Sequence, residues 1–200
     1  MAKIVVKNLV KKIGKTTPVN GVTFSVEEGK IFALVGEAGS GKSLIVKLVL
    51  GLVHKTSGIA KVDKDSYLGV CLPGSYFDEK ASLMEVLKQV ASLSSVKITR
   101  KRLKNILTLV GLGAIHGAKV KSLNLSQFTR LKLAAAFVCP PQILLLDDAF
   151  ANLSEEDAFG VRLILKSLVD KLGVTVLLTS QTLRGIEEIY DELYLTSSSK

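Results

Sequence analysis

The feature that most constrains the fold is a glycine-rich segment, residues 36–43, which follows a continuous apolar run at 31–35. An apolar run without alternation is typical of a strand buried in a parallel sheet. The apolar residues from 42 to about 52 predict a helix directly after the glycines. The segment reads Gly-Glu-Ala-Gly-Ser-Gly-Lys-Ser and matches the G-x-x-x-x-G-K-[ST] spacing of a phosphate-binding loop.

The chemistry of phosphate binding explains this spacing. Glycines let backbone N–H groups turn toward phosphate oxygens, and the following helix presents its positive end. Lys42 is expected to reach the β and γ phosphates of a nucleotide, and the Ser43 hydroxyl to ligate Mg²⁺. We therefore predict that the nucleotide-binding residues are Gly36, Glu37, Ala38, Gly39, Ser40, Gly41, Lys42 and Ser43.

A second candidate for the same site is an apolar run at 143–146 that ends in Asp147. A carboxylate at the end of a buried strand can hold Mg²⁺ through water, so the predicted metal site is Ser43 with Asp147. The two segments lie roughly a hundred residues apart. This separation disfavours the small nucleoside kinases and suits a nucleotidase core with a helical insertion.

The rest of the chain alternates between strand and helix patterns, which predicts an α/β fold with a mostly parallel sheet. A 3.6-residue period from 79 to about 111 predicts a helix that buries Leu103, Ile106, Leu107 and Val110. Ser154 resembles a helix cap to which the acidic side chain of Asp157 returns. The other expected strands are 3–6, 22–26, 174–178 and 192–195, and a further helix is expected at 127–137.

Composition excludes several classes of protein. Apolar residues make up 48% and charged residues 22% of the chain, which is ordinary for a globular domain. The apolar stretch 131–146 is interrupted by a lysine and two prolines, so no membrane span is expected, and the N-terminus does not resemble a signal peptide. Cys71 and Cys139 have no metal or redox companion motif. These features predict a soluble intracellular protein.

The net charge of +9 includes one dense basic run, residues 97–104. Three interpretations stay open: a solvated helix face, contact with an anionic membrane surface or a permease loop, and contact with nucleic acid.

The chain resembles the ATP-binding cassette (ABC) proteins over nearly its whole length. The resemblance rests on residues 36–43, on 20–29 before them, on 51–58 after them, on 130–147, and on 191–195 near the end. It implies a P-loop NTPase core with a mostly parallel sheet, an N-terminal antiparallel β subdomain and a small helical subdomain at about 78–125. Residues 1–200 would then be one nucleotide-binding domain, with ATP and Mg²⁺ as cofactors.

Family members hydrolyse ATP in head-to-tail dimers, and several positions depart from their pattern. By ungapped spacing, Asp148 stands where the family has a catalytic glutamate, and Ser180 where it has a switch histidine. The glutamine that senses the metal and water falls at Pro73 or Gly74. The carboxylate of Asp148 is one methylene shorter than that of glutamate and therefore lies further from the attacking water. A misplacement of about 1 Å can lower the rate roughly a hundredfold.

The face that completes a partner's site is altered as well. The signature Leu-Ser-Gly-Gly-Gln becomes residues 123–127, with Leu125 in place of a glycine; a gapped alternative keeps Ser126 as the signature serine. Ile13 occupies the position of the aromatic that stacks on adenine. Ser154 occupies the position of a dimer-loop aspartate. An ordinary helix cap is an equally good interpretation of this serine.

We therefore expect an ATP-binding subunit of a membrane transport complex with slow or absent hydrolysis. The resemblance implies a separately encoded permease, a homo- or heterodimer with another cassette, and a peripheral location on the cytoplasmic face of the membrane. One alternative is a soluble regulatory or nucleic-acid-associated cassette, although nucleic acid is the less expected partner. Another is a genuine slow ATPase that uses Asp148 as its catalytic residue.

Overall fold

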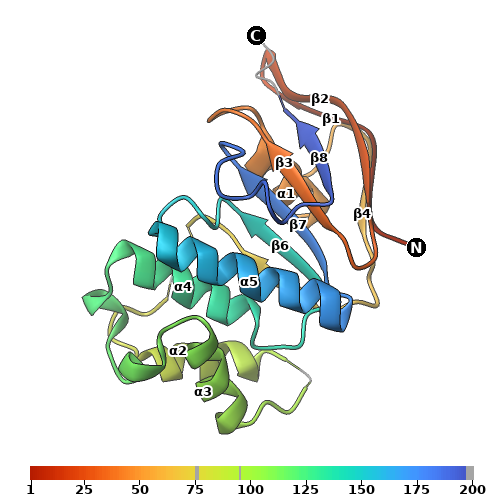
Figure 1. Cartoon of the computed structure of the whole chain (residues 1–200). Helices are drawn as coiled ribbons and strands as arrows, with labels where there is room; N and C mark the ends of the chain where they lie inside the picture. Colours follow the sequence, from red (N-terminus) through yellow and green to blue (C-terminus); the bar gives the residue numbers. More distant parts are fainter. Residues whose placement is uncertain (75–76, 95, 197–200) are drawn as a thin grey trace.

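A computed structural model describes residues 1–74, 77–94 and 96–196, which form two sheets and a group of helices (Figure 1). The first sheet is antiparallel, in the order β2-β1-β4: β1 (Ala2–Ile13), β2 (Thr16–Glu27) and β4 (Ser57–Val62). The second is parallel, in the order β5-β6-β7-β3-β8: β5 (Leu68–Cys71), β6 (Ile143–Asp147), β7 (Thr175–Ser180), β3 (Ile31–Val35) and β8 (Glu192–Leu195). The predicted α/β fold, with a parallel core sheet and an antiparallel N-terminal part, is confirmed.

The helices are α1 (Lys42–Val49), α2 (Leu83–Ser92), α3 (Arg100–Leu109), α4 (Leu125–Ala136) and α5 (Glu155–Leu172), with short 3₁₀ turns at Gly113–Ile115 and Val120–Ser122. The single helix expected at 79–111 is wrong, because the segment contains both α2 and α3. Ser82 and Thr99 each cap a helix N-terminus, accepting the backbone N–H of Glu85 and Arg102 at 3.2 Å. The predicted buried face of α3 is confirmed.

The central strands explain the continuous apolar runs of the sequence. Every residue of β3, β6 and β7 is buried, because these strands lie inside the sheet and are covered on both faces. One hydrophobic cluster joins the sheet to α4 and α5, and a second joins it to α1 and the antiparallel sheet. The register pairs Val35 with Ser180 and Asp147 with Thr179, so the carboxyl ends of the three strands lie level with one another.

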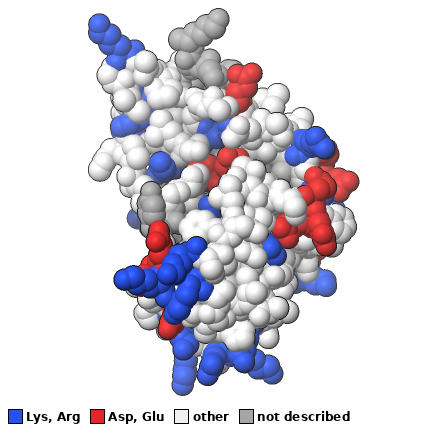
Figure 2. All heavy atoms as spheres, turned by 90° about the vertical axis from the view of Figure 1, so that its left-hand side faces the viewer, with Lys and Arg blue, Asp and Glu red and all other residues white. Residues whose placement is uncertain are grey.

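The cationic side chains of the basic run at 97–104 do not all lie on one exposed surface. Lys97, Arg100, Lys101 and Lys104 are exposed, and Figure 2 shows Lys and Arg side chains gathered at the end of the molecule where α2 and α3 lie. Arg102 is half-buried instead. Its Nε and Nη2 donate to the carbonyls of Val138 at 3.0 Å and Phe137 at 3.2 Å. Arg102 therefore caps the end of α4.

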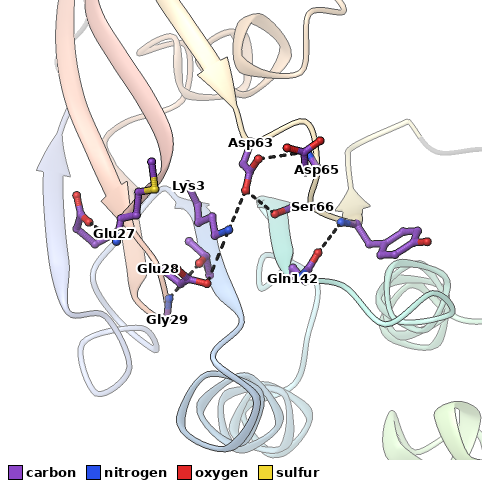
Figure 3. Close-up of polar contacts among 11 residues, drawn as sticks. Lys3, Glu27, Glu28, Gly29, Asp63, Asp65, Ser66 and Gln142 are labelled. Atoms are coloured by element: carbon purple, nitrogen blue, oxygen red, sulfur yellow. Dashed lines mark hydrogen bonds and ion pairs between the residues drawn. The ribbon is translucent and has the colours of Figure 1, made fainter.

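The two sheets are joined near the amino ends of the parallel strands (Figure 3). The bond between them runs from the Gly29 N–H, just after β2, to Thr175 Oγ1 of β7 at 3.0 Å. Within the antiparallel part, the Lys3 ammonium lies 2.8 Å from the Asp63 carboxylate and 3.7 Å from Glu28. The hydrogen bond from Lys3 lowers the pKa of Asp63 to about 2, assisted by Ser66. These contacts lie at the edge of the parallel sheet opposite the carboxyl ends of its strands.

Within the described residues, no helix is both long enough and apolar enough to cross a bilayer.

Candidate functional site

The glycine-rich segment forms the turn between β3 and α1. Gly41 has a φ of 89°, in the left-handed region, and a Cβ there would lie 2.5 Å from the Pro18 carbonyl oxygen. A Cβ at Gly36 would collide with the Thr196 carbonyl oxygen. Only glycine fits at these two positions, because β2 and the chain after β8 pack directly against the loop.

The N-terminus of α1 opens toward this loop. Gly41 caps the helix without any side-chain hydrogen bond, and the first turn contains no acidic residue. The first N–H groups of a helix lack internal partners, and they carry the positive end of the helix dipole. Together with the loop glycines, they form a cradle suited to phosphate oxygens.

Lys42 is the buried cation of this cradle, with 6% of its surface exposed. Its ammonium donates to the carbonyls of Gly36 at 2.6 Å and Glu37 at 2.7 Å, and to Ser40 Oγ at 3.1 Å. Burial lowers the pKa of Lys42, while the carboxylates of Asp148 and Asp147 oppose that shift. The lysine is thus held at the loop by groups that a nucleotide phosphate can replace.

Asp147 ends β6 beside the start of α1. Its Oδ1 accepts hydrogen bonds from Ser43 Oγ at 2.9 Å and Thr179 Oγ1 at 2.7 Å. Its Oδ2 is buried and has no hydrogen-bond partner among the described residues. A buried carboxylate oxygen without a partner is costly, and Mg²⁺ or a water bound to it would satisfy this atom. The residues present therefore fit a magnesium ion.

Asp148 follows with an unusual backbone, since its φ is 54°, a left-handed value that is uncommon for residues other than glycine. Its N–H donates to Thr179 Oγ1 at 2.9 Å, and its Oδ2 accepts from Gln181 Nε2 at 3.1 Å. The sequence interpretation did not include Gln181. The available signal was its place directly after Ser180, at the carboxyl end of a buried strand.

Lys42, Ser43, Asp148 and Gln181 line one cavity of about 390 Å³, and Asp147 lies beside it, bonded to Ser43. Ile13, which is 53% exposed, lies on its wall with Pro18. The remaining lining residues come from the loop, from α1 and from the end of β7: Ala38, Gly39, Ser40, Gly41, Leu44 and Thr179. The structure thus brings the predicted loop together with Asp147 and Asp148.

Two positions assigned by spacing do not line the cavity. The Ser180 hydroxyl donates to the Thr182 carbonyl at 2.7 Å, and the residue is 8% exposed, so its side chain is used to shape the turn. Pro73 and Gly74 lie exposed after β5 and are absent from the lining.

The signature region forms the start of α4. Asn124 and Gln127 exchange side chain-to-backbone hydrogen bonds of 2.8 and 3.0 Å in a capping box, and Leu125 is 62% exposed at the first helical position. The Ser126 hydroxyl donates to Asp157 Oδ2 at 2.5 Å. The serine of the gapped alternative therefore faces α5 of its own chain.

Ser154 caps α5 by accepting the Asp157 N–H at 3.1 Å, which confirms its interpretation as a helix cap. The Asp157 side chain also interacts with Ser154, in agreement with its expected return toward the cap. That carboxylate accepts from Ser126 and lies 3.4 Å from the Arg130 guanidinium. The hydrogen bond from Ser126 is the main reason that the pKa of Asp157 lies below its ordinary value.

Comparison with known proteins agrees with this geometry. The sequence model of the ABC transporter family matches residues 19–151. The lantibiotic transport ATP-binding protein SrtF of Streptococcus pyogenes is 32% identical over 193 residues, which cover 93% of this chain and 83% of SrtF. The zinc import ATP-binding protein ZnuC of Rickettsia bellii is 28% identical over 186 residues, with 93% and 79% coverage.

Solved structures show the same fold at lower identity. The dimeric bacterial ABC transporter cassette MJ0796 matches with a TM-score of 0.86 and 20% identity, over 96% of this chain and 94% of that one. The family match spans the phosphate loop and Asp147, which lie in or beside the cavity, and also the signature region at the start of α4. This chain belongs to the ABC transporter family and has the P-loop NTPase fold of its ATP-binding cassettes.

Proposed function

We propose that the chain is the ATP-binding subunit of a membrane transport complex, and that it binds MgATP through residues 36–43 with slow or absent hydrolysis. The observation that carries the proposal is that Lys42 and Ser43 line one cavity, while Asp147 lies behind it, bonded to Ser43, with one buried oxygen that has no partner among the described residues. This arrangement offers a cation for phosphate and oxygen ligands for magnesium.

Each residue would act through the geometry described above. Lys42 would exchange its loop carbonyls for phosphate oxygens, while the open N-terminus of α1 donates backbone N–H groups. Ser43 and Asp147 would hold Mg²⁺, which neutralises charge on the phosphates when bound. Thr179 keeps Asp147 oriented through its 2.7 Å hydrogen bond.

The proposal of slow hydrolysis rests on the groups around the terminal phosphate. Asp148 is one methylene shorter than glutamate and accepts a hydrogen bond from Gln181. The Ser180 hydroxyl is engaged with Thr182, and a serine cannot carry a proton as imidazole does. Leu125 presents an exposed apolar side chain where a glycine would let backbone approach phosphate.

The proposal extends to the assembly. We treat residues 1–200 as one cassette with a helical subdomain at about 78–125, which pairs with a second cassette, identical or different, and with a separately encoded permease on the cytoplasmic face of a membrane. The names of SrtF and ZnuC describe ATP-binding proteins of transport, which supports this assignment. The exposed cations of α3 suit an anionic membrane surface or a permease loop better than they suit duplex nucleic acid, because they lie within the helical subdomain.

The test of MgATP binding is a thermal shift. Ligand at a hundred times its dissociation constant should stabilise the protein by about 2.7 kcal/mol, and Lys42→Ala should remove most of that gain. Lys47→Ala is the matched control, since Lys47 lies exposed on the same helix and should leave the shift intact. Absence of any shift in the unmodified chain at millimolar MgATP would disprove the proposal.

A further inference from the structure

A cavity of about 510 Å³ lies apart from the nucleotide site. It is bounded by α3, by the connection from α4 to β6, and by the C-terminal end of α5, elements in the lower part of Figure 1. None of its described lining residues also lines the nucleotide cavity. Its volume falls within the roughly 300–1,000 Å³ of small-molecule sites, so its size suits a ligand of its own.

Most of the lining of this cavity is apolar. Ile106, Phe137 and Val174 are buried beneath it. Leu109, the last residue of α3, is 49% exposed, and Leu172, the last residue of α5, is 72% exposed, and both line the same cavity. A single exposed leucine is ordinary, but apolar side chains that share one cavity are typical of a binding site.

The polar part of the lining is cationic. Lys101, which is exposed, and Arg102 line the cavity, and the described lining contains no acidic residue. Arg102 is fixed, because its Nε and Nη2 donate to carbonyls at the end of α4, while its Nη1 makes no hydrogen bond within the described part of the chain. A fixed guanidinium with a donor to spare is suited to an anion.

The start of α3 also favours an anion. Its first turn contains Arg100, Lys101 and Arg102 and no acidic residue. Cations at the N-terminus of a helix oppose the helix dipole, whose positive end lies there, so this arrangement is unfavourable by itself. A bound anion would compensate the cations and the dipole together.

The lining changes from cationic to apolar along α3. Arg102 lies in the first turn, and Ile106 and Leu109 follow one and two turns later. Seven residues separate Arg102 from Leu109, which is about 10 Å along the helix axis. A matching ligand has an anionic head and an aliphatic chain of medium length. One such chain suits this volume better than the two chains of a phospholipid.

We infer that this cavity binds a free medium-chain aliphatic carboxylate. Its head would lie at the first turn of α3, near Lys101 and Arg102, and its chain would lie between α3 and α5 against Leu109 and Leu172. The site goes beyond the proposed function and does not depend on nucleotide binding.

The test uses isothermal titration with two probes of equal chain length and opposite head charge, sodium decanoate and decyltrimethylammonium. Decanoate should bind at one site, and the cationic probe at least about tenfold more weakly, because hydrogen bonds to charged groups are lost. Lys101→Glu should lower the affinity for decanoate about tenfold. Lys88→Glu, the same charge change at an exposed site on α2 outside the lining, should leave it within about twofold.

The apolar end of the cavity needs its own variant. Leu172→Gln should lower the affinity for decanoate about fivefold, because apolar contact with the chain is lost. Leu163→Gln is the matched control, since Leu163 is an exposed leucine of the same helix that does not line the cavity. Both leucines are exposed, so the melting temperatures of the ligand-free variants should stay within about 2 °C of the unmodified chain.

Three outcomes would overturn the inference: no binding of decanoate, equal binding of the two probes, or unchanged decanoate affinity in both Lys101→Glu and Leu172→Gln. Attachment to phosphatidylglycerol vesicles separates the free anion from a bilayer. If Leu172→Gln weakens that attachment and leaves decanoate binding intact, the leucine contacts a membrane and the inference is wrong. Decanoate binding without any MgATP-dependent thermal shift would support the inference and disprove only the proposed function.

Discussion

The two sides of the nucleotide cavity are built from different kinds of groups. The phosphate-loop side, residues 36–43, consists of backbone N–H groups and one buried lysine, and its glycines are required by the close approach of Pro18 and Thr196. The opposite side, at the ends of β6 and β7, consists of Asp148, Thr179 and Gln181, whose polar groups already have partners within the chain. Under the proposed function, the first side needs only an exchange of partners at Lys42, whereas the second must release several internal hydrogen bonds.

This difference has an energetic basis. A hydroxyl that already donates to a carbonyl or a carboxylate must give up that bond before it contacts a phosphate, so its net gain from the new contact is small. Thr179, on the second side, is in this state, and so are Ser180 and Ser126, which do not line the cavity. Lys42 is engaged as well, but its partners are mainly neutral carbonyls that a phosphate oxyanion can outcompete.

The largest expected effect comes from restoring the second side to the family pattern. Asp148→Glu alone should recover little steady-state phosphate release, because catalytic groups that act as a unit are strongly non-additive. A glutamate at φ 54° is also strained. The combination of Asp148→Glu, Gln181→His, Leu125→Gly and Ser126→Gly should raise the rate on the order of a hundredfold, since Gln181, and not Ser180, lines the cavity beside Asp148 and the two glycines open the signature in a homodimer.

Lys42→Ala in the combined variant is the control and should abolish the recovered activity. The opposite finding would be turnover near 1 s⁻¹ in the unmodified chain, sensitive to Lys42→Ala, on the order typical of a working enzyme. The side formed by β6 and β7 would then be competent as it stands, and Asp148 would serve as its catalytic residue.

A smaller effect on nucleotide affinity is expected at Ile13, on the cavity wall that would face the adenine base. Ile13→Tyr provides an aromatic surface beside Pro18 and should tighten MgATP binding about fivefold, at the low end for base stacking because the site is half exposed. Binding of inorganic triphosphate with Mg²⁺ should not change. Ile59→Tyr, at an exposed site on β4 that does not line the cavity, is the control. If the affinities for MgATP and for inorganic triphosphate increase equally, the substitution acts through the phosphate loop and not through the base.

The same division explains what the sequence could predict. The phosphate loop and Asp147 were recognisable because backbone cradles and buried strands leave local patterns of glycine and of apolar runs. The buried face of α3 was predicted for the same reason. The break between α2 and α3 was missed, although Ser82 with Glu85 is a local capping-box signal that was available in the sequence.

Gln181 and Arg102 were not predictable from local patterns. The contact of Gln181 with Asp148 depends on β7 lying between β6 and β3, and strand order is a long-range property. In the sequence, Arg102 is one cation among several in a basic run. In the structure, its guanidinium donates to the carbonyls of Phe137 and Val138 at the end of α4. Both side chains are placed by tertiary contacts between segments far apart in the sequence.

The smallest expected effect tests how firmly the signature region is held by its own chain. Asp157→Asn removes the charged acceptor of Ser126 and the partner of Arg130, and should destabilise the protein by about 1 kcal/mol. For a chain of this size, this corresponds to a decrease of roughly 2–4 °C in melting temperature. Glu156→Gln is the matched control, because it removes a charge from the same first turn of α5 but breaks none of these contacts.

The pH dependence of the melting temperature tests whether the Asp157 carboxylate makes this stabilising contact. Because the pKa of Asp157 is lowered in the folded chain, its contribution is complete above the ordinary aspartate value of 3.8 and disappears as the pH falls through the folded-state pKa. The difference in melting temperature between Asp157→Asn and Glu156→Gln should therefore shrink as the pH falls below 3.8 and through the lowered pKa of Asp157. Ser126→Ala added to Asp157→Asn should cost less than Ser126→Ala alone, since the bond has already lost its charged acceptor. A difference that persists unchanged at low pH, or additive losses, would show that Ser126 is not held by Asp157 and is free to contact a partner's nucleotide.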